Sequence, residues 1–138
     1  MKEDCLFCKL ANGVFPTNAA YEDDEFKVIM DIAPAAKGHC LVLPKKHFEN
    51  ALTIENEMYG KTMTLAAKMA KAVKKTLNCD GINILQNNGV AAGQTVFHLH
   101  VHIIPRYEND KVGLLPVANE GLDSDLAGTA KMINENIE

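Results

Sequence analysis

Three histidines alternate with apolar residues in the segment 97–104, which reads FHLHVHII. In a β-strand, successive side chains point to opposite faces and rise about 3.3 Å per residue. His98, His100 and His102 are therefore expected on one face. Phe97 and the apolar residues between the histidines would line the other face and pack against a helix.

Three imidazoles on one strand face allow three interpretations. An exposed polar face explains them poorly, because Thr, Lys or Glu would serve solubility better than three histidines. A transition metal bound by all three is a second interpretation. Phosphate chemistry is the third, since a neutral imidazole is nucleophilic, titrates near neutral pH and donates hydrogen bonds to anionic oxygens.

The loop before the histidines favours phosphate chemistry. Residues 87–95, NNGVAAGQT, combine two glycines with amide and hydroxyl donors, so backbone amides there can approach phosphate oxygens. The loop lacks the Gly-Lys-Ser/Thr ending of a P-loop. We therefore expect the loop to support the histidines at a phosphate site of another kind.

The cysteines form a second group with possible chemistry. Cys5 and Cys8 have the C-x-x-C spacing of metal and redox sites. The chain shows no export signal, so disulfides are the less favoured use of its four cysteines. A buried or redox-active pair without metal is the alternative. Cys40 and Cys79 are expected to be free thiols, and His39, in a turn, is interpreted as incidental.

The elements that would position these residues follow from periodicity. Residues 26–30 and 40–43 predict an antiparallel strand pair, and residues 82–87 predict a third strand. Apolar residues at helical spacing predict one long helix, with its lysines on a solvent-exposed face. Residues 96–104 are the strongest predicted strand, and a weaker, shorter helix is expected near the C-terminus. The segments predicted are strands 26–30, 40–43, 82–87 and 96–104, helices 54–77 and 122–137, and loops 12–13 and 16–18.

Composition narrows the class of protein. The chain has 138 residues, a net charge of −4 and only 6% aromatic residues with no Trp. This favours one α+β domain, residues 1–138, with a core of about 5–107 and a tail of 108–138. It disfavours nonspecific nucleic-acid or membrane-surface binding. With no targeting or membrane-spanning segment, we expect a cytoplasmic protein.

The motifs together resemble the histidine triad (HIT) family, and specifically its bacterial zinc-containing, Hint-like branch. His98 to Ile104 matches the family motif His-φ-His-φ-His-φ-φ, in which φ is apolar. The opening CLFCK at 5–9, the segment DIAP at 31–34, GH at 38–39 leading into LPKKH at 43–47, and GQT at 93–95 resemble further family features in the same order. The resemblance covers nearly the whole chain and is weakest beyond Tyr107.

The resemblance implies an antiparallel sheet of about five strands with one long helix and a shorter one, joined across a homodimer. It implies hydrolysis or transfer of nucleotides at the α-phosphate through a nucleotidyl-histidine. His100 would be the nucleophile, His102 would bind phosphate and assist the leaving group, and His98 would support the geometry. The remaining contacts implied are those of Gln94, Thr95 and Asn87 with phosphate, Asp31 with ribose hydroxyls, and Ile32 with the base.

The resemblance also implies a structural zinc ion on Cys5, Cys8, His47 and His98, whereas the chemistry requires no metal. Purine nucleoside 5′-phosphoramidate hydrolysis is the leading expectation. A dinucleoside polyphosphate hydrolase is the enzyme alternative, because Pro105-Arg106 after the triad resembles that branch. A nucleotide-binding regulatory protein without catalysis is the alternative from another class, and a zinc-dependent interaction module is a weaker one.

Overall fold

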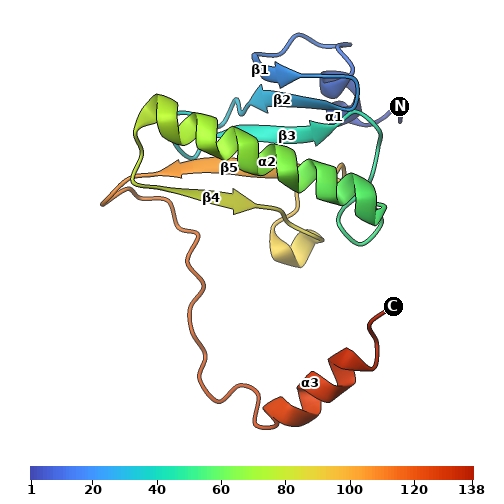
Figure 1. Cartoon of the computed structure of the whole chain (residues 1–138), viewed down its shortest axis with the longest axis vertical. Helices are drawn as coiled ribbons and strands as arrows, with labels where there is room; N and C mark the ends of the chain where they lie inside the picture. Colours follow the sequence, from blue (N-terminus) through green and yellow to red (C-terminus); the bar gives the residue numbers. More distant parts are fainter.

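A computed structural model describes residues 1–138 and contains one antiparallel sheet of five strands in the order β1-β2-β3-β5-β4. The long helix α2 crosses one face of the sheet and the short helix α1 packs on the other (Figure 1). This confirms the predicted α+β class. The elements are α1 (Leu6–Ala11), β1 (Ala19–Glu22), β2 (Phe26–Met30), β3 (Cys40–Pro44), α2 (Asn56–Leu77), β4 (Gly81–Leu85), a 3-10 turn (Val90–Ala92), β5 (Val101–Arg106) and α3 (Leu126–Asn134).

The sheet has two differently packed faces. Val42 pairs with Val28 on one side and Val101 on the other, and these three residues are buried against α2. Leu41 pairs with Ile29 and His102, and its side chain lies on the opposite face, towards α1. Because side chains alternate along each strand, one face of the sheet forms the main core and the other carries polar side chains such as His102.

Helix α2 follows the predicted periodicity. Leu65 and Met69 are buried against the sheet, while the lysines between Lys68 and Lys75 are exposed, as predicted. The helix ends at Leu77 and is capped by Asn78, whose φ of 49° is left-handed and whose N–H donates to the carbonyl of Lys74. Asparagine tolerates this conformation better than most residues, which makes it a suitable terminator.

The histidine segment differs from the prediction at its start. Strand β5 begins at Val101 rather than at residue 96 and extends to Arg106. The N–H of Leu99 donates to the carbonyl of Phe48 at 2.7 Å, so the chain before Val101 is bonded to a loop instead of a neighbouring strand. Phe97 is consequently 41% exposed, and the prediction that it packs on the helix-facing side was wrong.

Two short elements were not predicted. Helix α1 begins after Cys5, whose sulfur accepts a hydrogen bond from the N–H of Cys8, and β1 pairs with β2 at the edge of the sheet. Their six and four residues are too few to show a periodic pattern. Helix α1 and the residue before it bring Cys8 and Cys5 to the sheet.

The C-terminal segment extends away from the sheet. Arg106 anchors its start by donating two hydrogen bonds to Asp110 and one each to Asn83 and Val112. The chain then runs past β4 and ends in α3, which stands apart from the sheet (Figure 1). The predicted helix of residues 122–137 is thus present over a shorter range. No helix combines the length and the apolarity needed to cross a membrane.

Candidate active site and metal centre

A cavity of about 510 Å³ opens on the face of the sheet that carries α1. This is within the size range of small-molecule sites, about 300–1,000 Å³. Five residues predicted to bind a nucleotide line it: Asp31, Ile32, Thr95, His100 and His102. Residues of α1 and of the segment before β1 complete the wall, among them Leu6, Phe7, Leu10 and Thr17.

The side chain of His100 is buried and its ring orientation is fixed. Its Nδ1 lies 2.7 Å from the carbonyl oxygen of His98, which can only accept, so Nδ1 carries the proton. The lone pair of the neutral ring is therefore on Nε2. Burial lowers the pKa of His100, which keeps the ring neutral and able to act as a nucleophile near neutral pH.

His102 is held by a histidine that we had interpreted as incidental. The N–H of Ala35 donates to Nδ1 of His39 at 3.0 Å, so a neutral His39 carries its proton on Nε2. That Nε2 lies 2.9 Å from Nδ1 of His102 and donates to it, which leaves the proton of His102 on Nε2. Burial lowers the pKa of His102 to about 4, so the ring is neutral near pH 7.

The prediction that His39 is incidental was wrong. The side chain is 5% exposed, and Asp31 Oδ2 lies 3.5 Å from its Nε2. The sheet register could have indicated this position. Leu41 pairs with His102, and His39, two residues earlier, shares the face of Leu41.

Two further residues line the cavity and would contact a bound ligand, Phe7 through its ring and Thr17 through its hydroxyl. The Phe7 ring packs edge-on against His100, with centroids 4.9 Å apart. The hydroxyl of Thr17 is buried and has no hydrogen-bond partner in the protein. Neither residue was singled out from the sequence, because neither belongs to a spacing pattern.

Two residues expected to contact phosphate lie outside the cavity lining. Gln94 is 2% exposed; its oxygen accepts from Gly89, and its nitrogen donates to the carbonyls of Glu49 and Val96. Asn87 donates to the carbonyl of Gly93. In this structure the side chain of Gln94 holds the loop together, and its contact with phosphate stays a prediction.

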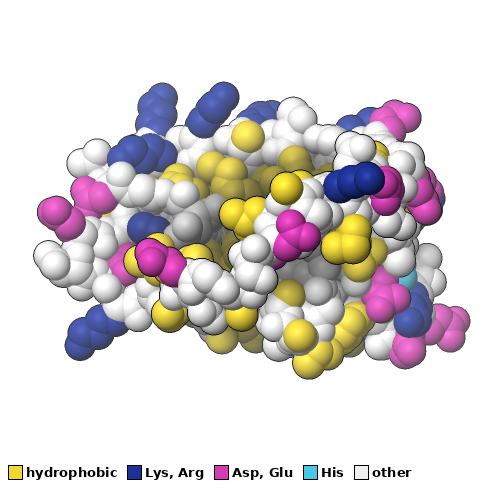
Figure 2. All heavy atoms as spheres, turned by 90° about the horizontal axis from the view of Figure 1, so that it is seen from below, with side chains coloured by type: hydrophobic (Ala, Val, Ile, Leu, Met, Phe, Trp, Pro, Cys, Tyr) yellow, Lys and Arg dark blue, Asp and Glu magenta, His cyan; other side chains and the backbone are white.

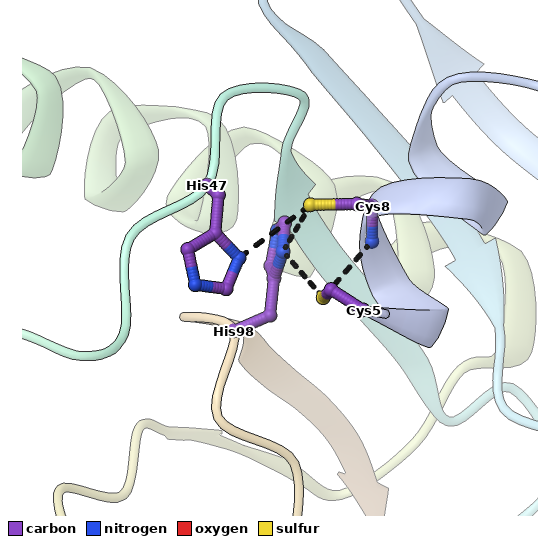
Figure 3. A group of neighbouring side chains, drawn as sticks. All are labelled: Cys5, Cys8, His47 and His98. Atoms are coloured by element: carbon purple, nitrogen blue, oxygen red, sulfur yellow. Dashed lines mark hydrogen bonds between the residues drawn. The ribbon is translucent and has the colours of Figure 1, made fainter. Parts of the chain in front are cut away.

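The four residues expected to bind zinc lie together (Figure 3). Nδ1 of His98 is 3.5 Å from the sulfurs of both Cys5 and Cys8, and Nδ1 of His47 is 3.5 Å from Cys8 Sγ. Helix α1 and its N-cap residue Cys5 supply the sulfurs, while the loop after β3 and the segment before β5 supply the rings. The four side chains converge from three places in the sequence.

The geometry and chemistry of this cluster fit a zinc ion. In a tetrahedral site with Zn–S near 2.3 Å and Zn–N near 2.05 Å, sulfur and nitrogen ligands are about 3.6 Å apart. The observed separations are 3.5 Å. Nε2 of His98 donates to the carbonyl of Pro44 at 2.8 Å, which leaves its Nδ1 lone pair directed at the sulfurs. Burial raises the pKa of the Cys8 thiol, so a thiolate there requires a nearby cation.

Two other metal arrangements do not fit. One metal bound by all three triad histidines does not fit, because both ring nitrogens of His98 are engaged elsewhere: Nδ1 faces the sulfurs of Cys5 and Cys8, and Nε2 donates to the carbonyl of Pro44. The group of Asp31, His39 and His102 also brings potential ligands together. Its two rings, however, share a hydrogen bond of 2.9 Å, so Nε2 of His39 is a donor and not a ligand. The interpretation as an exposed polar face is also wrong, since His98 and His100 are buried.

Comparison with known proteins places this site in a family. The family model described as HIT domain matches residues 12–109. The chain is 43% identical to the Bacillus subtilis protein named hit, covering 76% of this chain and 72% of that one. It is 45% identical to an uncharacterized HIT-like protein of Methanocaldococcus jannaschii, covering 77% and 81%. A plant relative, adenylylsulfatase HINT3 of Arabidopsis thaliana, is 38% identical over 80% of this chain and 56% of its own.

Solved structures agree in fold. A crystal structure from Streptococcus mutans superposes with a TM-score of 0.94 at 40% identity, covering 100% of this chain and 88% of that one. A HIT family protein from Bacillus anthracis superposes with a TM-score of 0.91 at 34% identity, covering 100% of both. A zinc-bound histidine triad protein from Mycobacterium smegmatis gives 0.76 at 34% identity, covering 96% and 97%. This chain therefore belongs to the HIT domain family.

Proposed function

We propose that the protein hydrolyses or transfers nucleotides at the α-phosphate through a covalent nucleotidyl-His100 intermediate. The observation that carries the proposal is the pair of opposite tautomers at the cavity. Nε2 of His100 has a free lone pair, whereas Nε2 of the neighbouring His102 carries a proton. A nucleophile and a hydrogen-bond donor thus lie side by side, with ring centroids 4.9 Å apart.

The proposed reaction has two displacements. Nε2 of His100 attacks the α-phosphorus, and the bond from phosphorus to the leaving group breaks as the P–N bond forms. Nε2–H of His102 donates a hydrogen bond to the leaving group, which takes a proton from a water molecule as it departs. The hydroxide formed from that water then attacks the phosphorus, and the P–N bond to His100 breaks. Nucleoside monophosphate is the product.

The other site residues take supporting roles in this proposal. Thr95 at the cavity wall contacts the phosphate, Asp31 accepts hydrogen bonds from the ribose hydroxyls, and Ile32 contacts the base at the cavity mouth. Gln94 and Asn87 act through the loop that they hold. His98 acts through its carbonyl, which orients His100, rather than through its ring.

We also propose that a structural zinc ion binds Cys5, Cys8, His47 and His98. When bound, the ion supplies a cross-link between α1 and the segment that leads into β5, and no step of the reaction uses it. The separations of 3.5 Å between sulfur and nitrogen support this proposal, and the zinc-bound mycobacterial relative is consistent with it.

A purine nucleoside 5′-phosphoramidate is the substrate that we favour. Dinucleoside polyphosphates are the alternative, suggested by Pro105-Arg106. Arg106, however, is engaged by Asp110, Asn83 and Val112 at the start of the tail, and it does not line the cavity. The name of the plant relative adds adenylyl sulfate to the substrates worth testing.

One assay separates these possibilities. Turnover of adenosine phosphoramidate, diadenosine polyphosphate and adenylyl sulfate is measured in parallel, with His100→Ala as control. We expect fastest release of AMP from the phosphoramidate, loss of turnover by about 10⁴-fold or more in His100→Ala, and a radiolabelled nucleotidyl-enzyme only in the unsubstituted protein. Label on His100→Ala would refute the nucleophile. AMP binding without turnover of any substrate would favour the regulatory alternative.

A further inference from the structure

One polar group on the wall of the active-site cavity has no task in the proposed reaction. Thr17 lines this cavity, and its Oγ1 is buried without a hydrogen-bond partner in the protein. Among the buried side-chain nitrogens and oxygens of the chain, it is the only one without a partner. A buried hydroxyl that makes no hydrogen bond costs free energy, and a valine would fill the same space without that cost. The hydroxyl therefore marks a position where a ligand supplies the partner.

The base is the part of the proposed substrate that still lacks a polar contact. Thr95 and two of the triad histidines are assigned to the phosphate and Asp31 to the ribose, whereas the base has only the apolar contact of Ile32. Of the polar side chains on the cavity wall, this leaves Thr17 and Asn18. The hydrogen-bonding atoms along the edges of a base need partners when the base leaves water. The unassigned hydroxyl can satisfy one of them, because it both donates and accepts.

The order of the strands places Thr17 at the end of the cavity where the base would lie. From the histidines outward, the sheet runs β5-β3-β2-β1. His102 is at the start of β5, Asp31 directly follows β2, and Thr17 lies two residues before β1. Neighbouring strands are about 4.8 Å apart, so about 14 Å separate β5 from β1. Phosphate, ribose and base follow one another along a nucleotide in the same order.

Backbone pairing places Thr17 beside the residue assigned to the ribose. The N–H of Met30 donates to the carbonyl of Asn18 at 2.9 Å, and the antiparallel pairing of β1 with β2 follows directly. In an antiparallel pair, the residue before Asn18 lies opposite the residue after Met30. Thr17 is therefore across from Asp31, on the side away from the histidines.

Helix α1 covers the same path from the other side of the cavity. Phe7 packs on the ring of the proposed nucleophile, and three residues later the carbonyl of Leu10 accepts a hydrogen bond from Lys27 of β2 at 3.3 Å. The helix thus runs from the histidines towards β2, and it lines the cavity with apolar side chains. A base would lie between α1 and Ile32, with the hydroxyl of Thr17 at its edge.

This cavity gives a ligand access to the nucleophile. On the face of the molecule that Figure 2 shows from below, acidic and basic side chains surround hydrophobic ones, and almost no histidine is visible. His98 and His100 are buried, while His100 and His102 line the cavity next to α1. A nucleotide that reaches His100 therefore occupies the space that extends from β5 to Thr17.

We propose that the hydroxyl of Thr17 forms a hydrogen bond with the base of the bound nucleotide and so helps to select ligands that carry a base with a polar edge. This inference rests on the proposed function, because it takes the cavity to bind a nucleotide. Rotation about χ1, the torsion that positions Oγ1, turns the hydroxyl from the wall into the cavity. In the free protein no hydrogen bond opposes that rotation.

Equilibrium binding of AMP, a product of the proposed reaction, tests the contact without turnover. Calorimetry compares the unsubstituted protein with Thr17→Val and Thr17→Ser. We expect Thr17→Val to raise the Kd for AMP about tenfold, which corresponds to about 1.4 kcal/mol. Thr17→Ser keeps the hydroxyl and should stay within about twofold of the parent. Equal affinity of Thr17→Val and the parent would overturn the contact, whereas no binding of AMP to the parent would overturn the proposed nucleotide site itself.

Two further ligands locate the contact on the nucleotide. 2′-Deoxy-AMP lacks one ribose hydroxyl, and ribose 5-phosphate lacks the base; both are measured by competition with a fluorescent AMP analogue. We expect Thr17→Val to weaken 2′-deoxy-AMP as much as AMP and to leave ribose 5-phosphate unaffected. A loss that disappears with 2′-deoxy-AMP would place Thr17 on the ribose, and a loss that persists with ribose 5-phosphate would place it on the ribose or the phosphate. Either result would overturn the assignment to the base.

Thr62→Val is the matched control for affinity. Thr62 is a fully buried threonine of α2 outside the cavity, and its hydroxyl donates to the carbonyl of Met58 at 2.7 Å. We expect this variant to keep the parental Kd for AMP, and weaker binding by it would show that the loss in Thr17→Val is not specific to the cavity. Thr17→Val should keep or raise the Tm of the free protein, because it removes no hydrogen bond. A fall in its Tm by more than about 4 °C, the effect of losing a typical hydrogen bond, would show a structural role and overturn the proposal.

Discussion

At the scale of single residues, His100 and His102 are only two positions apart but differ in tautomer. The hydrogen bonds at their Nδ1 atoms leave a lone pair on Nε2 of His100 and a proton on Nε2 of His102. The carbonyl of His98 fixes a proton on one ring, and Nε2 of His39 donates to the other. The triad pattern places both rings at the cavity but cannot distinguish them. That distinction depends on His39 and on the backbone amide of Ala35.

Replacing His39 should therefore impair turnover more than binding. In His39→Leu, Nδ1 of His102 loses its donor, and its proton is no longer confined to Nε2. We expect kcat for the phosphoramidate to fall about tenfold to a hundredfold, part of what a positioned hydrogen-bond donor contributes, while KM changes little. His39→Gln, whose side-chain amide can still donate, should recover most of the rate. Equal rates in the two variants would argue against this positioning role.

The lowered pKa of His102 should make stability depend on pH. The pKa is about 4 in the folded protein and near 6.5 in the unfolded chain, because burial disfavours the charged ring. Between these values the unfolded state binds the extra proton, so stability is complete above about pH 6.5 and falls towards pH 4. The slope from one such group is at most about 1.4 kcal/mol per pH unit.

Denaturant unfolding of His102→Asn measures this contribution. We expect a shallower decline in the free energy of unfolding between pH 6.5 and pH 4 than in the unsubstituted protein. Lys71→Gln, which removes an exposed group that stays charged throughout this range, should leave the slope unchanged. A slope in His102→Asn as steep as that of the parent would show that other groups dominate.

At the scale of elements, the sequence predicted the strands and the helix whose apolar residues recur at a regular spacing. Strands 26–30 and 40–43 and the long helix lie close to their predicted ranges because their apolar periodicity is regular. The predicted start of β5 was wrong, since the bond from Leu99 to Phe48 joins segments distant in sequence. Phe7 and His39 were missing from the predicted site for the same reason. Each contacts the triad histidines from a segment distant in sequence, and neither belongs to a spacing pattern.

Helix α1 is the element most dependent on the proposed zinc site. Six residues are too few for a helix that is stable alone, and Cys5 and Cys8 tie this one to His47 and His98. Chelation of zinc should therefore increase hydrogen exchange across residues 5–11, and it should raise KM because Phe7 leaves its place against His100. Cys8→Ser should behave like the chelated protein.

Cys79→Ser is the matched control, because Cys79 is equally buried but far from the cluster. It should retain stoichiometric zinc and low exchange in α1. Slow exchange in α1 after complete removal of zinc, verified by elemental analysis, would contradict the proposed structural role.

At the scale of the whole molecule, the net charge of −4 conceals an uneven distribution. The acidic excess belongs to residues 108–138, while residues 1–107 have one more basic residue than acidic ones. Because the part of the chain that forms the cavity is close to neutral, its histidine and hydroxyl donors can meet the anionic substrate that we propose without strong repulsion.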